Sequence, residues 1–338
     1  MAIGIAVLAN TRPYEGFVLS SVSGVILLIE LFRRLTSWRL AAVRIGLPML
    51  IVLGIVAIGM GYYFWRITGN PFLMPYSVNR EQYSANGYFV WQAPGAIPVY
   101  HHKVIADFYL KAHLPYFLAA RSLGGFVRST LVKVASIWLF FVGPALTIPL
   151  FALPWTLRDK RIRPLVITIG VSFVAVCMSP FFFPHYFAPV APCILAVTLQ
   201  SMRHQRLWIW EGRPIGEFLV RSAVLICVLM IFVRAAILWG ESRSGQRPPE
   251  MVRQDVLLKL ESLPGPQLAL VRYSQNHGLL APDWVDNGAD IDGSKVVWAR
   301  DMGREQNQEL LDYFHDRTFW LVEPDENPPK VLPYPEAR

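Results

Sequence analysis

Charged residues are scarce in this chain of 338 residues: Asp, Glu, Lys and Arg supply 17% of it, against about 25% in a typical soluble domain. The shortage lies before Trp239, where apolar residues dominate, whereas mixed charge, prolines and short apolar runs follow Gly240. A single soluble domain is therefore excluded. The composition predicts a membrane domain over residues 1–239 and a soluble domain over residues 240–338.

Cysteine is also scarce, and the three cysteines present, Cys177, Cys193 and Cys227, lie in apolar segments where a thiol acts as a small hydrophobic group. Their spacing matches neither a metal site nor a disulfide framework. The chain also lacks the glycine-rich loop of phosphate-binding NTPases and the nucleophile elbow of serine hydrolases. These absences argue against those enzyme classes, and they leave the chain without a predicted metal ligand.

Long apolar runs are what the chain has in abundance. A membrane-spanning helix needs about 20 apolar residues, and five stretches approach or exceed that length: Phe17–Phe32, Ile45–Trp65, Leu131–Leu153, Pro164–Met202 and Ile215–Trp239. Because proline stops a helix, Pro180 and Pro184 divide the longest stretch into two helices joined around Phe181–Tyr186. We therefore expect an α-helical polytopic domain of about six spans, with Met1–Ala9 as the end of a partial helix.

Basic residues gather in three short loops, at Arg33–Arg39, Leu157–Arg163 and Met202–Pro214. These loops alternate with the six expected helices, so all three face the cytoplasm under the positive-inside rule. We therefore expect a multi-pass protein of the inner (plasma) membrane, with the lipid bilayer as a partner and the C-terminal domain outside the cytoplasm. The same loops account for the net charge of +8 without nucleic-acid binding.

The C-terminal region has the pattern of a small α/β domain. Helices are expected at Met251–Leu263 and Glu305–Asp316, and strands at Gln267–Tyr273, Lys295–Ala299 and Thr318–Val322. This order is typical of a parallel sheet with helices on its faces. The four aspartates between Asp283 and Asp292 do not match the calcium loop of an EF-hand, so we expect them to be turn and cap residues.

Candidate functional residues gather on the expected outer side of the membrane. They come from the turn Asn10–Gly16, from the long loop at residues 66–127, and from the tip Phe183–Phe187 between the paired helices. Charges at a membrane boundary are expensive and often functional, and long loops rich in aromatic residues are seldom idle. The candidate binding residues are Arg12, Glu15, Asn79, Arg80, Tyr83, Trp91, His101, Lys103, His185 and Tyr186.

Two kinds of binding chemistry are represented in this set. The phosphate-binding candidates share a positive charge or an imidazole, and they are Arg12, Arg80, Lys103 and His185. The ring-stacking candidates for a sugar or a prenyl chain are Tyr83 and Trp91. Structural alternatives stay open for each place: a local ion pair in the first turn, an aromatic belt in the loop, and a helix cap at the tip. Adjacent His101 and His102 point apart, which disfavours a metal site.

Three segments resemble membrane glycosyltransferases of the GT-C type, in particular bacterial relatives of the protein mannosyltransferases. They are ANTRPYEG at residues 9–16, YYFWRITGNP at residues 62–71 and FPHYFAP at residues 183–189. The resemblance implies a helical membrane domain with a long outer loop. It also implies transfer of a sugar from a polyprenyl phosphate, on the outer face, to a protein, lipid or glycan. In that family an acidic residue of the first outer loop acts as base or metal ligand.

The chain departs from that family at the point that concerns catalysis. The family has several more helices before the turn that corresponds to Arg12–Gly16, and its acidic residue belongs to that part. No residue here, Glu15 included, takes the catalytic role, and a divalent metal is expected only in a complete enzyme. Two functions stay open: a glycosyltransferase-like protein, or the C-terminal part of one, and a non-catalytic membrane anchor or scaffold with an envelope protein as partner.

Overall fold

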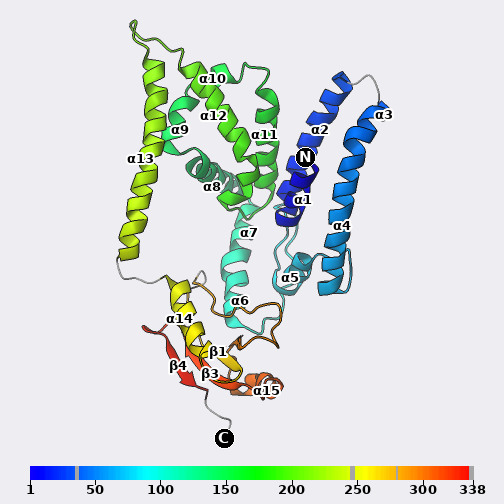
Figure 1. The fold of residues 1–338 in the computed structure, drawn as a ribbon, viewed down its shortest axis with the longest axis vertical. Coiled ribbons are helices and arrows are strands. Elements are labelled where there is room, and N and C mark those ends of the chain that lie inside the picture. The colour runs from blue at the N-terminus through cyan, green and yellow to red at the C-terminus, as the bar shows by residue number, and fades with distance from the viewer. Residues whose placement is uncertain (35–37, 244–247, 279–280, 335–338) are drawn as a thin grey trace. The chain divides into compact units, whose positions relative to one another are not determined.

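A computed structural model describes residues 1–34, 38–243, 248–278 and 281–334. The chain forms two compact units (Figure 1). The helical unit contains Met1–His101 and Phe108–Phe232, and the α/β unit contains His102–Asp107 and Val233–Arg338.

Four helices in the described residues are long and apolar enough to cross a membrane. They are α2 (Pro13–Arg34), α4 (Leu47–Thr68) with the preceding turns α3 (Trp38–Ala41) and η1 (Ala42–Gly46), α8 (Leu123–Phe141) and α13 (Ile215–Arg243). Their apolar side chains are largely exposed, which is compatible with a lipid bilayer. The predicted polytopic class is thus supported, whereas the expected count of about six spans is not reached by length.

The predicted break at the two prolines is confirmed. Helix α11 (Arg163–Met178) ends before Pro180, a 3₁₀ turn η3 follows at Pro184–Val190, and α12 (Ala191–Gln205) completes the pair. Phe187 and Val190 of η3 are buried against Val176, so the turn has a small core of its own. With 16 and 15 residues, α11 and α12 are each shorter than the roughly 20 residues of a full span.

The span expected at Leu131–Leu153 is wrong in its boundaries. Ser122 caps the first turn of α8 by accepting a hydrogen bond from the N–H of Gly125 at 3.1 Å, so the helix begins eight residues earlier than expected, at Leu123 rather than Leu131. It stops at Phe141, because Gly143 adopts a left-handed φ of 61° and a proline follows. A separate helix α9 (Gly143–Leu150) and a short α10 (Leu153–Thr156) follow.

The region expected as one long loop is partly helical. It contains α5 (Pro75–Tyr83), α6 (Lys103–Asp107), a π-helical turn η2 (Phe108–His113) and α7 (Leu114–Ala120). At the N-terminus, α1 (Ala2–Thr11) packs on α2, and α2 packs on α11 (Figure 1). The α1–α2 contact needs Gly16, since a Cβ there would lie 2.7 Å from Cβ of Leu8.

The described part of the α/β unit has a four-stranded sheet in the order β2-β1-β3-β4. The strands β1 (Gln267–Val271), β2 (Val296–Arg300) and β3 (Thr318–Glu323) are parallel, as predicted. The fourth strand, β4 (Lys330–Pro333), pairs antiparallel with β3 and was not predicted. The prolines around it weaken its strand pattern, and they are tolerated because β4 lies at the edge of the sheet.

The two faces of the sheet are covered by different helices. Val256 and Leu260 of α14 (Pro249–Glu261) pack against Ala269 and Val271 on one face. On the other face, α15 (Arg304–Tyr313) packs Leu310 and Leu311 against a buried cluster that includes Leu268 and Leu270. The alternation along β1 therefore supplies both cores, as expected for a strand buried on both sides.

The free edge of β2 is closed by a side chain. Asn287 donates from Nδ2 to the carbonyl oxygen of Trp298 at 2.8 Å and accepts from the N–H of Trp298 at 2.8 Å. The amide thus makes the same pair of bonds that a further strand would make to this residue.

Candidate functional site

The helical unit contains a cavity of about 470 Å³ that brings together segments far apart in the sequence. Its size is that of a pocket for a small molecule. It is lined by Tyr76, Asn79, Arg80, Ser84, Tyr109, Ala112, His113, Tyr116, Phe181, Phe182, Phe183 and Tyr186. We call it the aromatic cavity. Three of the predicted candidates, Asn79, Arg80 and Tyr186, line it.

Helix α5 supplies the polar side of the aromatic cavity. Pro75 occupies the first turn, where its missing N–H costs nothing and its fixed φ favours the helix. Tyr76, Asn79 and Arg80 then fall three and four residues apart, a spacing that places side chains on one face of a helix. The sequence alone therefore sets these three side chains side by side.

Arg80 is held in place from several directions. Its guanidinium lies 3.9 Å from the ring centre of Tyr88, donates to the carbonyl oxygen of Asn86, and lies 3.5 Å from the hydroxyl of Tyr76. A guanidinium has five N–H donors, so these bonds leave others for an anion in the cavity. Such fixed, planar donors suit a phosphate group.

The π-helical turn η2 builds the opposite side. Tyr109 and His113 lie at its two ends, and Tyr116 follows on α7. The ring of His113 stacks on Phe181 with 4.5 Å between ring centres, and burial lowers its pKa, with a further lowering by the positive charge of Arg80. Burial also raises the pKa of Tyr109, so both groups are neutral near pH 7. Single-turn π-helices are frequent at functional sites.

Sequence analysis missed Tyr109, His113 and Tyr116. Their spacing of four and three residues is the period of one helix face, and it is the signal that could have found them. Phe181 and Phe182 were expected only in the turn between the paired helices, whereas Phe183 belonged to the candidate tip Phe183–Phe187. All three line the aromatic cavity.

Arg12, His185 and Tyr186 form a second cluster. Arg12 lies at the corner between α1 and α2, and its Nη2 atom is 3.0 Å from Nε2 of His185. Its guanidinium carbon is 3.6 Å from the ring centre of Tyr186, a cation–π contact. The ion pair with Glu15, weighed as an alternative, is not formed in the part of the chain that the structure describes, because Arg12 reaches η3 instead. Tyr186 joins this cluster to the aromatic cavity.

The predicted ring-stacking residues lie outside the lining. Tyr83 follows Arg80 on α5, and its ring lies 6.3 Å from that of Tyr109. Trp91 stacks on Phe89 with 4.6 Å between ring centres and leaves 61% of its surface exposed. Phe89 in turn meets Tyr14 at the beginning of α2, so this part of the loop lies at the end of a predicted span.

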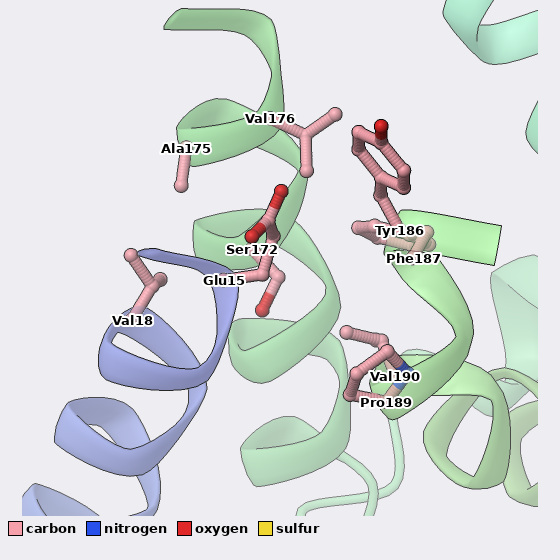
Figure 2. Close-up of a pocket in the computed structure, with 9 residues that line it drawn as sticks. All are labelled: Glu15, Val18, Ser172, Ala175, Val176, Tyr186, Phe187, Pro189 and Val190. Atoms are coloured by element: carbon pink, nitrogen blue, oxygen red, sulfur yellow. The ribbon is translucent and has the colours of Figure 1, made fainter. Parts of the chain in front are cut away.

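The remaining candidates are placed elsewhere. His101 is exposed and does not line the aromatic cavity. Lys103 begins α6, which belongs to the α/β unit. Glu15 lines a separate pocket between α2 and α11, drawn in Figure 2. Tyr186 lines that pocket too, so one ring forms part of both walls.

The aspartates of the α/β unit were expected as turn and cap residues, and they serve partly in turns and partly as partners of distant side chains. Asp290 accepts from the N–H of Gly293 at 3.0 Å, and Asp292 accepts from the hydroxyl of Tyr313 at 3.0 Å. Asp283 accepts from the hydroxyl of Tyr273 and from the guanidinium of Arg300. Among the described residues, no three His, Cys, Asp or Glu side chains gather in a way that could hold a metal ion.

A further polar pair lies where the parallel strands β1 and β3 end, and sequence analysis did not anticipate it. Nδ1 of His277 is 2.8 Å from Asp325, whose other carboxylate oxygen accepts from the N–H of Ser274 at 2.7 Å. Burial raises the pKa of Asp325, but the hydrogen bonds from His277 and Ser274 outweigh it and lower the pKa overall. The pair ties the two strand ends together.

Comparison of the chain with family models, with curated proteins and with solved structures gave no match. The geometry of the aromatic cavity and the resemblance of three segments to GT-C glycosyltransferases are therefore the basis for a functional proposal.

Proposed function

We propose that the protein is a membrane-bound, glycosyltransferase-like protein, or the C-terminal part of one, whose aromatic cavity binds a polyprenyl-phosphate-linked sugar on the outer face of the inner membrane. The observation that carries this proposal is the position of Arg80. It is a fixed guanidinium among tyrosine, phenylalanine and histidine rings, in a cavity of about 470 Å³.

The composition of the cavity fits a sugar phosphate. Arg80 supplies the donors for a phosphate, while Asn79 and neutral His113 supply hydrogen-bonding groups for hydroxyls. Tyr116 and Phe181 supply ring faces on which the apolar face of a sugar ring can stack. The prenyl chain would lie along the exposed apolar surfaces of the spanning helices, in the lipid.

The proposed topology places this cavity on the outer side. We propose that α11 and α12 cross the membrane as a pair, although a 16-residue helix covers only about 24 Å. Residues 179–183, between α11 and η3, form a bend and an irregular segment that would complete the crossing. With the basic loops in the cytoplasm, α5, η2 and η3 face outward together with the C-terminal domain.

One observation favours the alternative, a non-catalytic scaffold or anchor that binds an envelope protein. The lining of the aromatic cavity contains no aspartate or glutamate in the part of the chain that the structure describes. A base or a divalent metal would therefore have to come from outside this lining. The proposal accordingly assigns binding to the cavity and assigns the transfer step to no residue.

The test is binding of a polyprenyl-phosphate sugar to the full chain in nanodiscs. We expect Arg80→Gln to weaken binding about tenfold or more, since a lost charged hydrogen bond is worth roughly 1.5–3 kcal/mol. Arg161→Gln, an exposed arginine of a predicted cytoplasmic loop, is the matched control and should bind as the parent does. Equal binding of all three proteins would refute the assignment.

A second measurement separates the enzyme from the scaffold. The chain alone is given a donor with a radiolabelled sugar and a mixture of envelope peptides and glycans. Transfer of label would establish an enzyme, whereas binding without transfer would support the scaffold.

A further inference from the structure

The pocket between α2, α11 and η3 is lined by the polar side chains of Glu15 and Ser172, by Tyr186, and otherwise by apolar residues. Figure 2 shows the side chain of Glu15 reaching from the beginning of α2 to the face of α11 that carries Ser172. The apolar residues of the lining are Val18, Ala175, Val176, Phe187, Pro189 and Val190. A carboxylate in such surroundings needs polar partners.

Neither polar group finds a partner in the described protein. The hydroxyl of Ser172 is buried, in a residue 6% exposed, and has no hydrogen bond there. Likewise, the carboxylate of Glu15 has no hydrogen bond or ion pair to another described residue. A buried hydroxyl without a partner costs about 1–3 kcal/mol by general experience, so such groups are rare in native proteins.

Ser172 does not make the hydrogen bond to its own helix that serine and threonine usually make in apolar helices. Within apolar helices, serine and threonine hydroxyls often donate to the carbonyl oxygen four residues earlier. Thr168, one turn before, does so toward Pro164 at 2.8 Å, and Thr198 of α12 does so toward Ile194 at 2.9 Å. The hydroxyl of Ser172 makes no such bond and lines the pocket instead.

The volume of the pocket limits the size of its ligand. It measures about 10 Å³, which is at the lower limit for holding one water molecule. A buried water needs two to four polar partners, and the two oxygens of Glu15 and the hydroxyl of Ser172 meet that need. A divalent cation would need about six oxygens, which this lining does not offer.

We propose that the pocket binds one ordered water molecule, which donates to the carboxylate of Glu15 and hydrogen bonds to the hydroxyl of Ser172. The water would join α2 to α11 beside the direct bond from the hydroxyl of Tyr14 to the carbonyl oxygen of Ala175 at 2.9 Å. Because Tyr186 lines both this pocket and the aromatic cavity, the water would lie behind one wall of the aromatic cavity. The inference does not depend on the proposed function.

The experiment is thermal unfolding of the full chain in nanodiscs, with no added ligand. We expect Ser172→Ala and Ser172→Val each to lower the unfolding midpoint by roughly 2–4 °C, as for a loss worth one hydrogen bond. In a Glu15→Met background the effect of Ser172→Ala should largely disappear, because the water has already lost its main partner. Thr168→Val is the control, and its effect should be the same in both backgrounds.

Even if Glu15→Met does not fold, the direction in which Ser172→Val shifts the unfolding midpoint shows whether the pocket holds a water molecule. A dry pocket would gain from the added methyl groups and from the loss of an unpaired hydroxyl, so an unchanged or higher midpoint would overturn the proposal. Equal losses from Ser172→Ala in both backgrounds would overturn it as well. Binding of the sugar lipid is a separate measurement, so this inference and the proposed function can fail independently.

Discussion

The guanidinium of Arg12 lies 3.0 Å from Nε2 of His185, a residue 173 positions away. Since arginine can only donate, Nε2 of His185 must accept, and the imidazole carries its proton on Nδ1. The same guanidinium covers the ring of Tyr186. One side chain therefore ties the α1–α2 corner to the tip between α11 and α12.

This contact predicts that Arg12→Lys is not a conservative change. Lysine keeps the charge but loses the planar group that bonds His185 while covering a ring. We expect a fall of about 1–2 kcal/mol in the free energy of unfolding, from the hydrogen bond and the cation–π contact together. Chemical unfolding in mixed micelles measures this. Arg161→Lys, on an exposed loop, should leave stability unchanged, and an equal effect of both substitutions would contradict the role given to Arg12.

Lys133 of α8 predicts a second stability effect. It is 2% exposed, and its Nζ donates to the carbonyl oxygens of Val176 at 3.2 Å and Ser179 at 2.6 Å, at the end of α11. The ammonium thereby pairs with carbonyls that the helix itself cannot satisfy. We expect Lys133→Met to destabilise the protein by about 1–3 kcal/mol, measured by unfolding in micelles. Arg128→Met, an exposed position on the same helix, should cost far less; a similar loss there would show that the effect is not specific.

The α/β unit should lose stability at both ends of the pH scale. Burial opposes ionisation of Asp283, but hydrogen bonds from Tyr273 and Val285 and the charge of Arg300 lower its pKa below the usual 3.8. The stabilisation that ionised Asp283 gives to the folded unit is therefore present above about pH 4, and it is lost as pH falls through the lowered pKa. Burial and the bond to Asp283 raise the pKa of Tyr273 above 10.0, so its contribution is lost as pH rises beyond that value.

Hydrogen exchange of residues 267–300 in the full chain, corrected for intrinsic rates, measures the loss of stability at both acid and alkaline pH. In Tyr273→Phe the loss of stability at alkaline pH should disappear, while the loss at acid pH should persist in part, because Val285 and Arg300 still stabilise the ionised Asp283. If this variant lost as much stability at alkaline pH as the parent does, a group other than Tyr273 would be responsible for that loss.

Reporter fusions test the membrane topology. Fusions after Arg39, Lys160 and Arg206 should report the cytoplasm, and a fusion after Arg338 should report the outer side. The fusion after Lys160 tests whether the chain crosses the membrane between the long outer loop and α11, where α8 is the candidate span. A C-terminus in the cytoplasm would place the aromatic cavity on the wrong side for a polyprenyl-linked donor and would contradict the proposed function.

Strong local signals made much of the fold predictable. Two prolines four residues apart located the break at residues 180–184, and short runs of apolar and β-branched residues located the three parallel strands. The elements whose boundaries were predicted wrongly depend on backbone geometry or on contacts between residues distant in the sequence. The end of α8 at Phe141 follows from the left-handed φ of Gly143, which composition does not reveal.

The candidate site was predictable in part for the same reason. Asn79 and Arg80 were predicted as polar residues of a long loop rich in aromatic residues, whereas the helix α5 that carries them was not predicted. His113 becomes part of the site only through the π-helical turn and the stacking on Phe181, which comes from a segment 68 positions away. Lys133 escaped notice because a lone lysine in an apolar run has no partner in the sequence; its partners are backbone carbonyls of another helix.

The side-chain clamp of Asn287 on Trp298 has a consequence for contacts between copies of the protein. An open strand edge would let sheets from neighbouring molecules join into larger aggregates. The amide blocks one edge, and Lys330 and Pro333 in the short strand β4 make the other a poor template. Neither edge of the sheet is therefore an open template for a strand of a neighbouring molecule.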